Sequence, residues 1–201
     1  MSLHSRRDLH KPSHSLRLQR RMNPEAGVTI PQLLVTAVVI VILSTITISN
    51  SLATWRSSQA GELAQRLAGW LEEVSRAPEV IGKSCRVTIS TGTLGINAVL
   101  ARAEVVNGNG TERCSSDPTL RLTTSYGSNS VAVGATSTSI VFTPRQAITS
   151  TSDIQVRLAI ANQAPVRCVR LSAVLGLIRV GRNDGTSSVG TDCPAASFDS
   201  I

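Results

Sequence analysis

The sequence is poor in aromatic residues and has no histidine beyond its N-terminal part. Aromatic residues make up 2% of the 201 residues, so stacking platforms for single-stranded nucleic acid are not expected and the core must be aliphatic. All three histidines precede Gly27, at His4, His10 and His14. A chain that begins after Gly27 therefore has no Ser-His-Asp or Cys-His arrangement and no histidine to bind a metal.

Acidic residues are few, and they do not converge. Glu72 and Glu73 are predicted to lie on the solvated face of a helix, away from any other carboxylate. The four cysteines contain no C-x-x-C spacing of the kind found in zinc sites and thioredoxin-like motifs. We therefore expect no catalytic residue, no metal, no cofactor and no small-molecule substrate, and we do not expect an enzyme.

Charged side chains are missing from residues 26–55. Between Val28 and Ser49 nearly every residue is apolar, Ser or Thr, and a helix needs roughly 20 such residues to cross a hydrocarbon core of ~30 Å. A basic arm precedes the run, and by the positive-inside rule it stays in the cytoplasm while the C-terminus points outward. The cations of this arm are Arg6, Arg7, Lys11, Arg17, Arg20 and Arg21.

The apolar run also fits two other interpretations. One is a secretory signal peptide, with Ser51-Leu52-Ala53 as its cleavage site. The other is the uncleaved signal anchor of an unrelated exported protein. In all three cases the residues that follow are numerous enough for one compact exported domain with its own core.

Beyond the apolar run, helical periodicity continues to the proline at position 78. Apolar residues recur at helical spacing and define one buried stripe. We expect an amphipathic helix over residues 51–78 that ends at Ala77-Pro78, or two helices with a break near Ser57-Ser58. The stripe consists of Ala60, Leu63, Ala64, Leu67, Trp70, Leu71 and Val74.

The remainder of the chain, residues 79–201, has the pattern of an antiparallel β domain. Short β-branched runs alternate with Gly, Asn, Ser and Pro, and Ile154–Ile160 alternates as a half-buried strand does. Val174–Gly176 is predicted to join two late strands as a hairpin. The expected strands are Cys85–Ser90, Ala98–Val106, Thr119–Thr124, Ser130–Val133, Ser139–Thr143, Ile154–Ile160, Val166–Ser172 and Leu177–Val180.

The even number of cysteines favours disulfides on the oxidising side of a membrane. Three connectivities are possible for Cys85, Cys114, Cys168 and Cys193. We favour Cys85–Cys114 with Cys168–Cys193, because each pair closes a short loop, although spacing alone does not decide between them.

One basic feature lies on the late strands. No acid occurs between Asp153 and Asp184, whereas five arginines do, and arginines gathered on one sheet face bind phosphate backbones. The alternative is that they only solubilise the outer face of the sheet. The five are Arg157, Arg167, Arg170, Arg179 and Arg182.

The N-terminal motif is a basic leader that ends in Gly27, then Val28-Thr29-Ile30-Pro31-Gln32, then Leu33-Leu34-Val35 and the apolar helix. It resembles the type IV prepilin signature. The resemblance implies that a prepilin peptidase removes residues 1–27 by cleavage between Gly27 and Val28 and that Val28 is then N-methylated. It also implies assembly through Gln32, Leu33, Leu34 and Val35. The family usually has an aromatic residue and a Glu where this chain has Val28 and Gln32, which fits a scarce or tip-located subunit.

The order of elements resembles the GspH/FimT-type minor pseudopilins. The matching segments are Leu67–Arg76 leading into Cys85–Ile89, Val141–Arg145, Arg167–Ser172 and Leu175–Val180. Gln146 stands where the family often has a Gly. The implied fold is α+β and pilin-like, with a transmembrane and filament-core helix over residues 28–50 that continues as the amphipathic helix and packs on the antiparallel β domain.

The resemblance implies a structural subunit, a minor pilin or pseudopilin of a type IV pilus or of a type II secretion system. Its partners are then other pilins, the prepilin peptidase and the inner membrane, and its final place is a periplasmic or extracellular filament. Two alternatives stay open. One is a DNA-binding minor pilin acting in DNA uptake through the five arginines, and the other is an uncleaved, signal-anchored periplasmic domain.

Overall fold

The structure is a computed structural model that describes residues 29–123, 130–186 and 188–198, and only the backbone of residues 43–53. The chain divides into two units, Met1–Thr45 and Ile46–Ile201. The fold is α+β, with one long helix and two antiparallel sheets. The predicted α+β class is thereby confirmed.

Helix α1 spans Ile30–Ile81 without the break considered near Ser57-Ser58. It ends later than predicted, since Pro78 lies inside its last turn. Pro78 lacks an N–H, so the carbonyl of Val74 loses its helical donor, but only this one hydrogen bond close to the helix end is removed. Gly82 then ends the helix in the left-handed conformation, with φ 67°, and its N–H donates to the Pro78 carbonyl at 2.9 Å.

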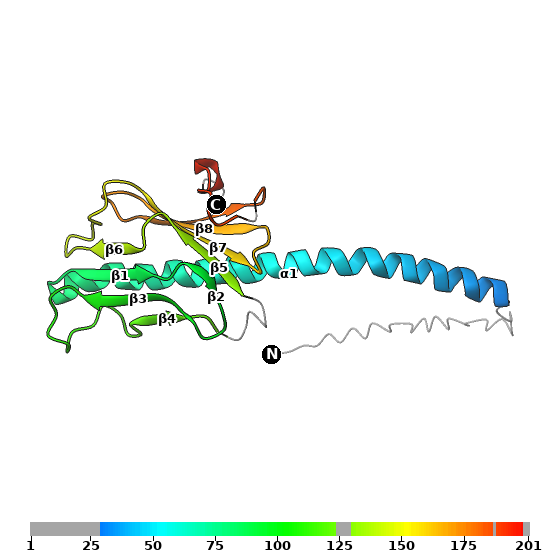
Figure 1. The fold of residues 1–201 in the computed structure, drawn as a ribbon, viewed down its shortest axis with the longest axis horizontal. Helices are drawn as coiled ribbons and strands as arrows, with labels where there is room; N and C mark the ends of the chain where they lie inside the picture. Colours follow the sequence, from blue (N-terminus) through cyan, green and yellow to red (C-terminus); the bar gives the residue numbers. More distant parts are fainter. Residues whose placement is uncertain (1–28, 124–129, 187, 199–201) are drawn as a thin grey trace, which may run out of the picture. The chain divides into compact units, whose positions relative to one another are not determined.

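The predicted apolar stripe of α1 is buried in the second unit. Leu63, Ala64, Leu67, Leu71 and Val74 are fully or almost fully inaccessible to solvent. They pack in one core with side chains from both sheets, which lie beside this part of the helix (Figure 1). The hydrophobic effect of this burial holds the helix to the β domain.

The first sheet has the strand order β4-β3-β1-β6, all antiparallel. Its strand β1 alternates buried and exposed residues, as a half-buried strand does. All four strands were predicted, with ends that coincide or differ by one residue, except that β4 stops at Arg121, whereas its predicted end at Thr124 lies outside the described residues. The strands are β1 Cys85–Ile89, β3 Val99–Val105, β4 Thr119–Arg121 and β6 Ser139–Phe142.

The second sheet has the order β2-β5-β7-β8-β9. Strand β2 was not predicted, because a three-residue run that starts with glycine carries no periodicity. Strands β8 and β9 form the predicted hairpin, whose turn places Val174 and Gly176 at positive φ. The strands are β2 Gly92–Leu94, β5 Val131–Ala135, β7 Ile154–Ile160, β8 Val166–Leu171 and β9 Ile178–Asn183.

Strand β7 is buried on both faces, and the prediction of a half-buried strand was wrong. Its inner face contributes to the main core, whereas its outer face lies under residues 189–198. This C-terminal segment, residues 189–198, ends in the 3-10 helix η2 (Ala195–Phe198) beside β8 and β9 (Figure 1). Cys193 and Phe198 form a second small core with Ala132, Ala159, Val166 and Cys168.

Candidate functional site

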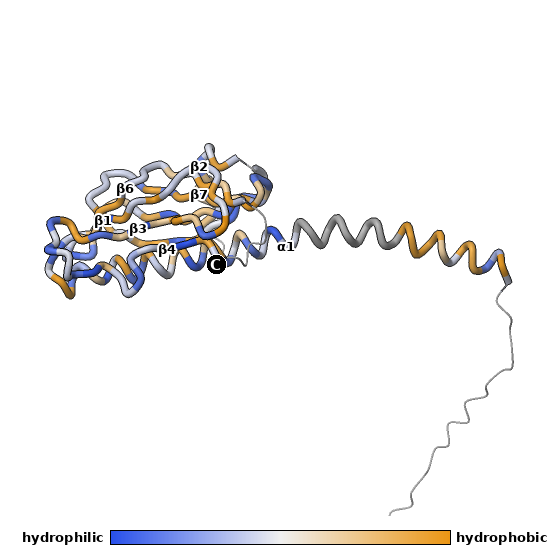
Figure 2. Tube along the Cα trace, turned by 60° about the horizontal axis from the view of Figure 1, so that its bottom comes forward, coloured by the Kyte–Doolittle hydropathy of each residue, from blue (hydrophilic) through white to orange (hydrophobic). Residues whose placement is uncertain are grey.

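The first turns of α1 expose a set of large apolar side chains, between which lie the polar residues Gln32 and Thr36. Ile30 is 78% exposed, and none of the other eight is less than 48% exposed. The hydropathy colouring shows this segment as mostly hydrophobic, with a short hydrophilic stretch near the start of the helix (Figure 2). The exposed side chains are Ile30, Leu33, Leu34, Val35, Val38, Val39, Ile40, Val41 and Ile42.

The start of this helix is uncharged. The carbonyl of Thr29 accepts hydrogen bonds from the N–H groups of Gln32 and Leu33, at 2.9 and 3.1 Å. Pro31 fits in this turn, because a first-turn residue needs no backbone donor. The first turn carries no acidic residue, and Gln32 is exposed, so its carboxamide can form hydrogen bonds but cannot neutralise a cation.

The residues predicted for processing, Gly27 and Val28, lie outside the described residues. The residues predicted for assembly, Gln32, Leu33, Leu34 and Val35, all lie exposed on the helix. Within the part of the chain whose side chains are described, no helix has the length and apolar character that a membrane crossing requires.

The five arginines of the late strands do not share one face of the sheet. Directly opposed residues of antiparallel strands lie on the same face. Arg170 is paired with Arg179, and Arg167 is paired with Arg182. Because positions 167 and 170 of one strand differ by an odd number, the two pairs lie on opposite faces. The prediction that all five gather on one face was wrong.

Most of these arginines also bind aspartates or the helix. Arg157 pairs with Asp192, Arg170 with Asp153, and Arg182 with Asp184. On the inner face Arg167 donates to the hydroxyl of Ser57 on α1 at 3.0 Å. Of the five, Arg179 alone has no hydrogen bond or ion pair with the residues that the structure describes.

Both disulfides are the pairs favoured by short-loop closure. Cys85 on β1 is bonded to Cys114, with Cα atoms 5.8 Å apart, and Cys168 on β8 is bonded to Cys193, with Cα atoms 6.6 Å apart. The first ties the loop before β4 to the first sheet, and the second ties the C-terminal segment to the second sheet. Among the described residues no cysteine is free.

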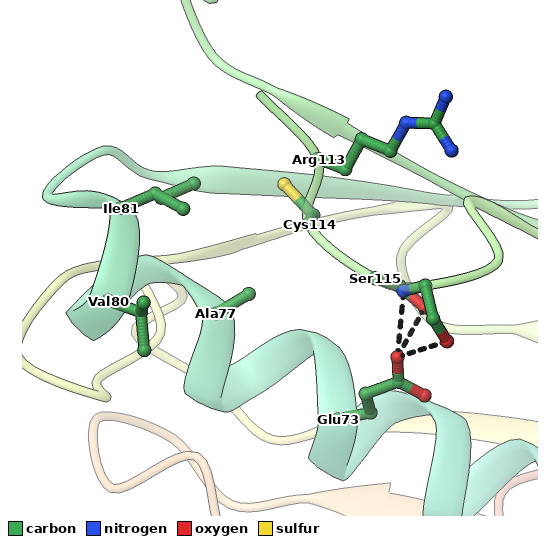
Figure 3. A pocket seen from close by; sticks show the side chains of 8 residues that line it. Glu73, Ala77, Val80, Ile81, Arg113, Cys114 and Ser115 are labelled. Atoms are coloured by element: carbon green, nitrogen blue, oxygen red, sulfur yellow. Dashed lines mark hydrogen bonds between the residues drawn. The ribbon is translucent and has the colours of Figure 1, made fainter. Parts of the chain in front are cut away.

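An open hollow of about 440 Å³ lies between the end of α1 and the loop that contains Cys114. Ala77, Val80 and Ile81 form its apolar side (Figure 3). Its one carboxylate is already satisfied, since Glu73 Oε1 accepts hydrogen bonds of 2.8–2.9 Å from the N–H and hydroxyl of Ser116 and the hydroxyl of Ser115. These bonds lower the pKa of Glu73, led by the Ser116 N–H. Glu73 therefore fastens this loop to the helix.

Chemistry-bearing clusters are not evident elsewhere in the described ranges. No group of three or more His, Cys, Asp and Glu side chains there could hold a metal ion.

Comparison of the chain with protein-family models, with curated proteins and with solved structures finds no match. The exposed apolar start of α1 is therefore the feature on which a function can be argued.

Sequence reasoning missed the acids that neutralise the arginines. Asp153 and Asp184 are the residues that bound the acid-free stretch, and Asp192 follows shortly after it. The alternation of a strand was the available signal, because Arg167 and Arg170 cannot point to the same face at that spacing. The C-terminal segment covers the outer face of the second sheet, and no periodic pattern in the sequence predicted this.

Proposed function

We propose that this chain is a pilin-like structural subunit, a minor pilin or pseudopilin of a type IV pilus or a type II secretion system. The observation that supports this best is the apolar segment Ile30–Ile42, which exposes about half or more of each large side chain. Exposed apolar area of this extent is costly in water, at about 25 cal/mol per Å². A segment of this kind needs a lipid or protein environment.

In this proposal the segment has two successive environments. It first lies in the inner membrane, as part of the apolar stretch between Val28 and Ser49, with the basic leader on the cytoplasmic side. After cleavage between Gly27 and Val28 it leaves the lipid and packs against the same segments of neighbouring subunits. Helix packing then replaces lipid contacts, and the β domain lies outside the filament core.

Gln32 sets the strength of one contact in this assembly. An unpaired ammonium at the new N-terminus is unfavourable in an apolar bundle. The amide oxygen of Gln32 can accept a hydrogen bond from it but provides no negative charge. The proposal therefore assigns this chain a scarce or terminal position in the filament, beside subunits that supply a carboxylate.

The deciding experiment is mass spectrometry of the N-terminal peptide of the membrane-derived protein, from cells that contain a prepilin peptidase. A peptide that begins at methylated Val28 is expected. A peptide that begins at Thr54 would indicate a secreted domain, and an intact leader would indicate a signal anchor, and either result overturns the proposal. The Gly27→Leu variant is the matched control, since it leaves the apolar segment unchanged and is expected to keep its leader.

The alternative of a DNA-binding subunit has less support. It relied on five arginines on one face, and the strand pairing separates them. A version restricted to the outer face has Arg157 and Arg170 already paired with aspartates. Replacing all five with Gln is expected to leave DNA binding unchanged at physiological salt, and a large loss would restore this alternative.

A further inference from the structure

A group of arginines lies where α1 meets the turn between β7 and β8. Arg56 donates to the side chain of Gln163 in that turn. Arg167 donates to Ser57, and Arg182 lies directly opposite Arg167 on the neighbouring strand. We refer to Arg56, Arg167 and Arg182 as the arginine patch.

The arginine patch is only partly neutralised by the residues that the structure describes around it. Asp184, which pairs with Arg182, is its one carboxylate among the described residues. Arg167 has no carboxylate partner, and its buried Nε has no hydrogen-bond acceptor. Burial lowers the pKa of the Arg167 guanidinium, and the charge of Arg182 lowers it further, with Asp184 acting in the opposite direction. Like charges placed directly opposite each other in a sheet are unfavourable, so this patch favours an anion.

The position of the patch along the chain indicates which anion. Arg56 is the first charged residue after the apolar run, and Trp55 immediately before it is 63% exposed. Exposed tryptophan beside a cation is typical of the boundary between a membrane and water. Twenty helical residues from Ile30 end at Ser49, and Arg56 follows seven residues later, about 10 Å further along the helix.

Measured to the backbone of Arg56, that distance slightly exceeds the thickness of the lipid headgroup layer. The polar layer extends about 5–8 Å beyond each side of the hydrocarbon core. Helical side chains point back toward the N-terminus, and long arginine side chains reach several ångströms in that direction. The guanidinium of Arg56 and the turn that contains Gln163 therefore come to the depth of the lipid phosphates.

We propose that Trp55 and the arginine patch form a docking surface for the phosphate headgroups of an anionic bilayer. This inference rests on the proposed function, because it requires the apolar segment to be inserted in a membrane before assembly. Before assembly, the docking surface holds the β domain of the subunit against the outward-facing surface of the inner membrane. Leaving the membrane for the filament breaks these contacts, so anionic lipid opposes extraction.

The test is hydrogen-deuterium exchange of the full chain in lipid nanodiscs. Discs of phosphatidylcholine alone are compared with discs that contain about one third phosphatidylglycerol. We expect the exchange of peptides covering residues 161–168 and 178–186 to slow in the anionic discs only, by about fivefold for each guanidinium engaged. The slowing is expected to disappear in high salt.

Three variants make the test specific. Arg56→Gln with Arg182→Gln is expected to abolish the lipid-dependent slowing. Arg102→Gln with Arg145→Gln removes the same charge from exposed positions elsewhere in the β domain and is expected to leave it unchanged. Asp184→Asn removes the one carboxylate of the patch and is expected to increase the slowing, about fivefold. This opposite effect keeps the test informative if the double variant folds poorly.

The remaining outcomes separate the two proposals. Protection of Ile30–Ile42 in both kinds of disc, with no lipid-dependent slowing at residues 161–168, overturns the docking surface but leaves the proposed function intact. Exchange of Ile30–Ile42 as in water contradicts the proposed function itself. Equal slowing in both kinds of disc, or slowing by duplex DNA and not by anionic lipid, also overturns the docking surface.

Discussion

Arg157 in the middle of β7 is only 5% exposed, and its guanidinium is paired with Asp192 of the C-terminal segment. The same guanidinium donates to the carbonyl of Gly190 at 3.4 Å, whereas its Nε has no acceptor. A buried cation on the outer face of the sheet therefore depends on the last residues of the chain for its counter-charge.

We expect Asp192→Asn to destabilise the protein more than Arg157→Met does. The first change leaves a buried guanidinium without a carboxylate and costs about 1–3 kcal/mol. The second removes the charge together with its need for a partner and keeps an apolar stem in the same space. Free energies of unfolding from urea titrations measure both. Asp184→Asn, at an exposed pair, is the control and should cost less than about 1 kcal/mol. Equal losses for Asp192→Asn and Arg157→Met would contradict this account.

Acid is expected to weaken the attachment of the Ser115-Ser116 loop to α1. The folded-state pKa of Glu73 lies below its ordinary value of 4.5, chiefly because of the Ser116 N–H. The contribution of this carboxylate is complete above pH 4.5 and is lost as the pH falls through the folded pKa. In Glu73→Gln the fall of stability toward low pH should be shallower.

The measurement that checks this prediction is the urea midpoint of unfolding of the wild type and of Glu73→Gln, from about pH 6 to about pH 2. Part of the fall will remain in the variant, since the pKa of Asp153 is also lowered, by the N–H of Ala173 and then by Arg170. Parallel profiles for the wild type and Glu73→Gln would show that the loop is held by other contacts.

Gly134 on β5 is predicted to tolerate no side chain. A Cβ there would lie 2.1 Å from the carbonyl oxygen of Val189, which is backbone and cannot rotate away. Gly134→Ala should displace the C-terminal segment and destabilise the fold by about 1–3 kcal/mol. Gly69→Ala is the opposite case, because its Cβ would meet nothing within 4 Å on an exposed helix face, and a gain of about 0.5–1 kcal/mol is expected. The midpoints of thermal unfolding of both variants, compared with that of the wild type, test these two predictions.

Each disulfide is expected to stabilise the domain by about 3.5 kcal/mol in the chain-entropy model. The bonded cysteines are 29 residues apart in the first case and 25 in the second. The variants Cys85→Ala with Cys114→Ala, and Cys168→Ala with Cys193→Ala, should lose similar amounts. Only the second should expose Phe198 and the outer face of β7. Peptide mapping without reduction tests the pairing, and cross-linked peptides of any other combination would contradict it.

Periodicity predicted most of the elements that pack on α1. The helical stripe from Ala60 to Val74 was found because burial on one face leaves a repeating pattern in the sequence. The strand Ile154–Ile160 was found from its alternating apolar residues, although its other face is buried as well. The end of α1 was not found, since Pro78 is tolerated in a last turn. Gln146, at φ 58°, adopts a conformation more usual for glycine, and its side chain donates a hydrogen bond to Glu79 of α1.

The candidate site was predictable only as far as it depends on local sequence. The uncharged stretch before Arg56 is visible in the sequence, and the structure shows its first turns uncovered. The grouping of Arg56 with Arg167 and Arg182 depends on how the β7–β8 turn meets the helix, which requires contacts across more than a hundred residues. No local pattern contains that information.

The C-terminal segment also sets the order in which the domain can fold. Cys193 and Phe198 are the last residues of their core to be synthesised, yet they cover Ala132, Ala159 and Cys168, which are made much earlier. A growing chain therefore carries an incompletely covered sheet until residues 189–198 have been synthesised. During that interval the uncovered face of β7 exposes apolar side chains that favour aggregation.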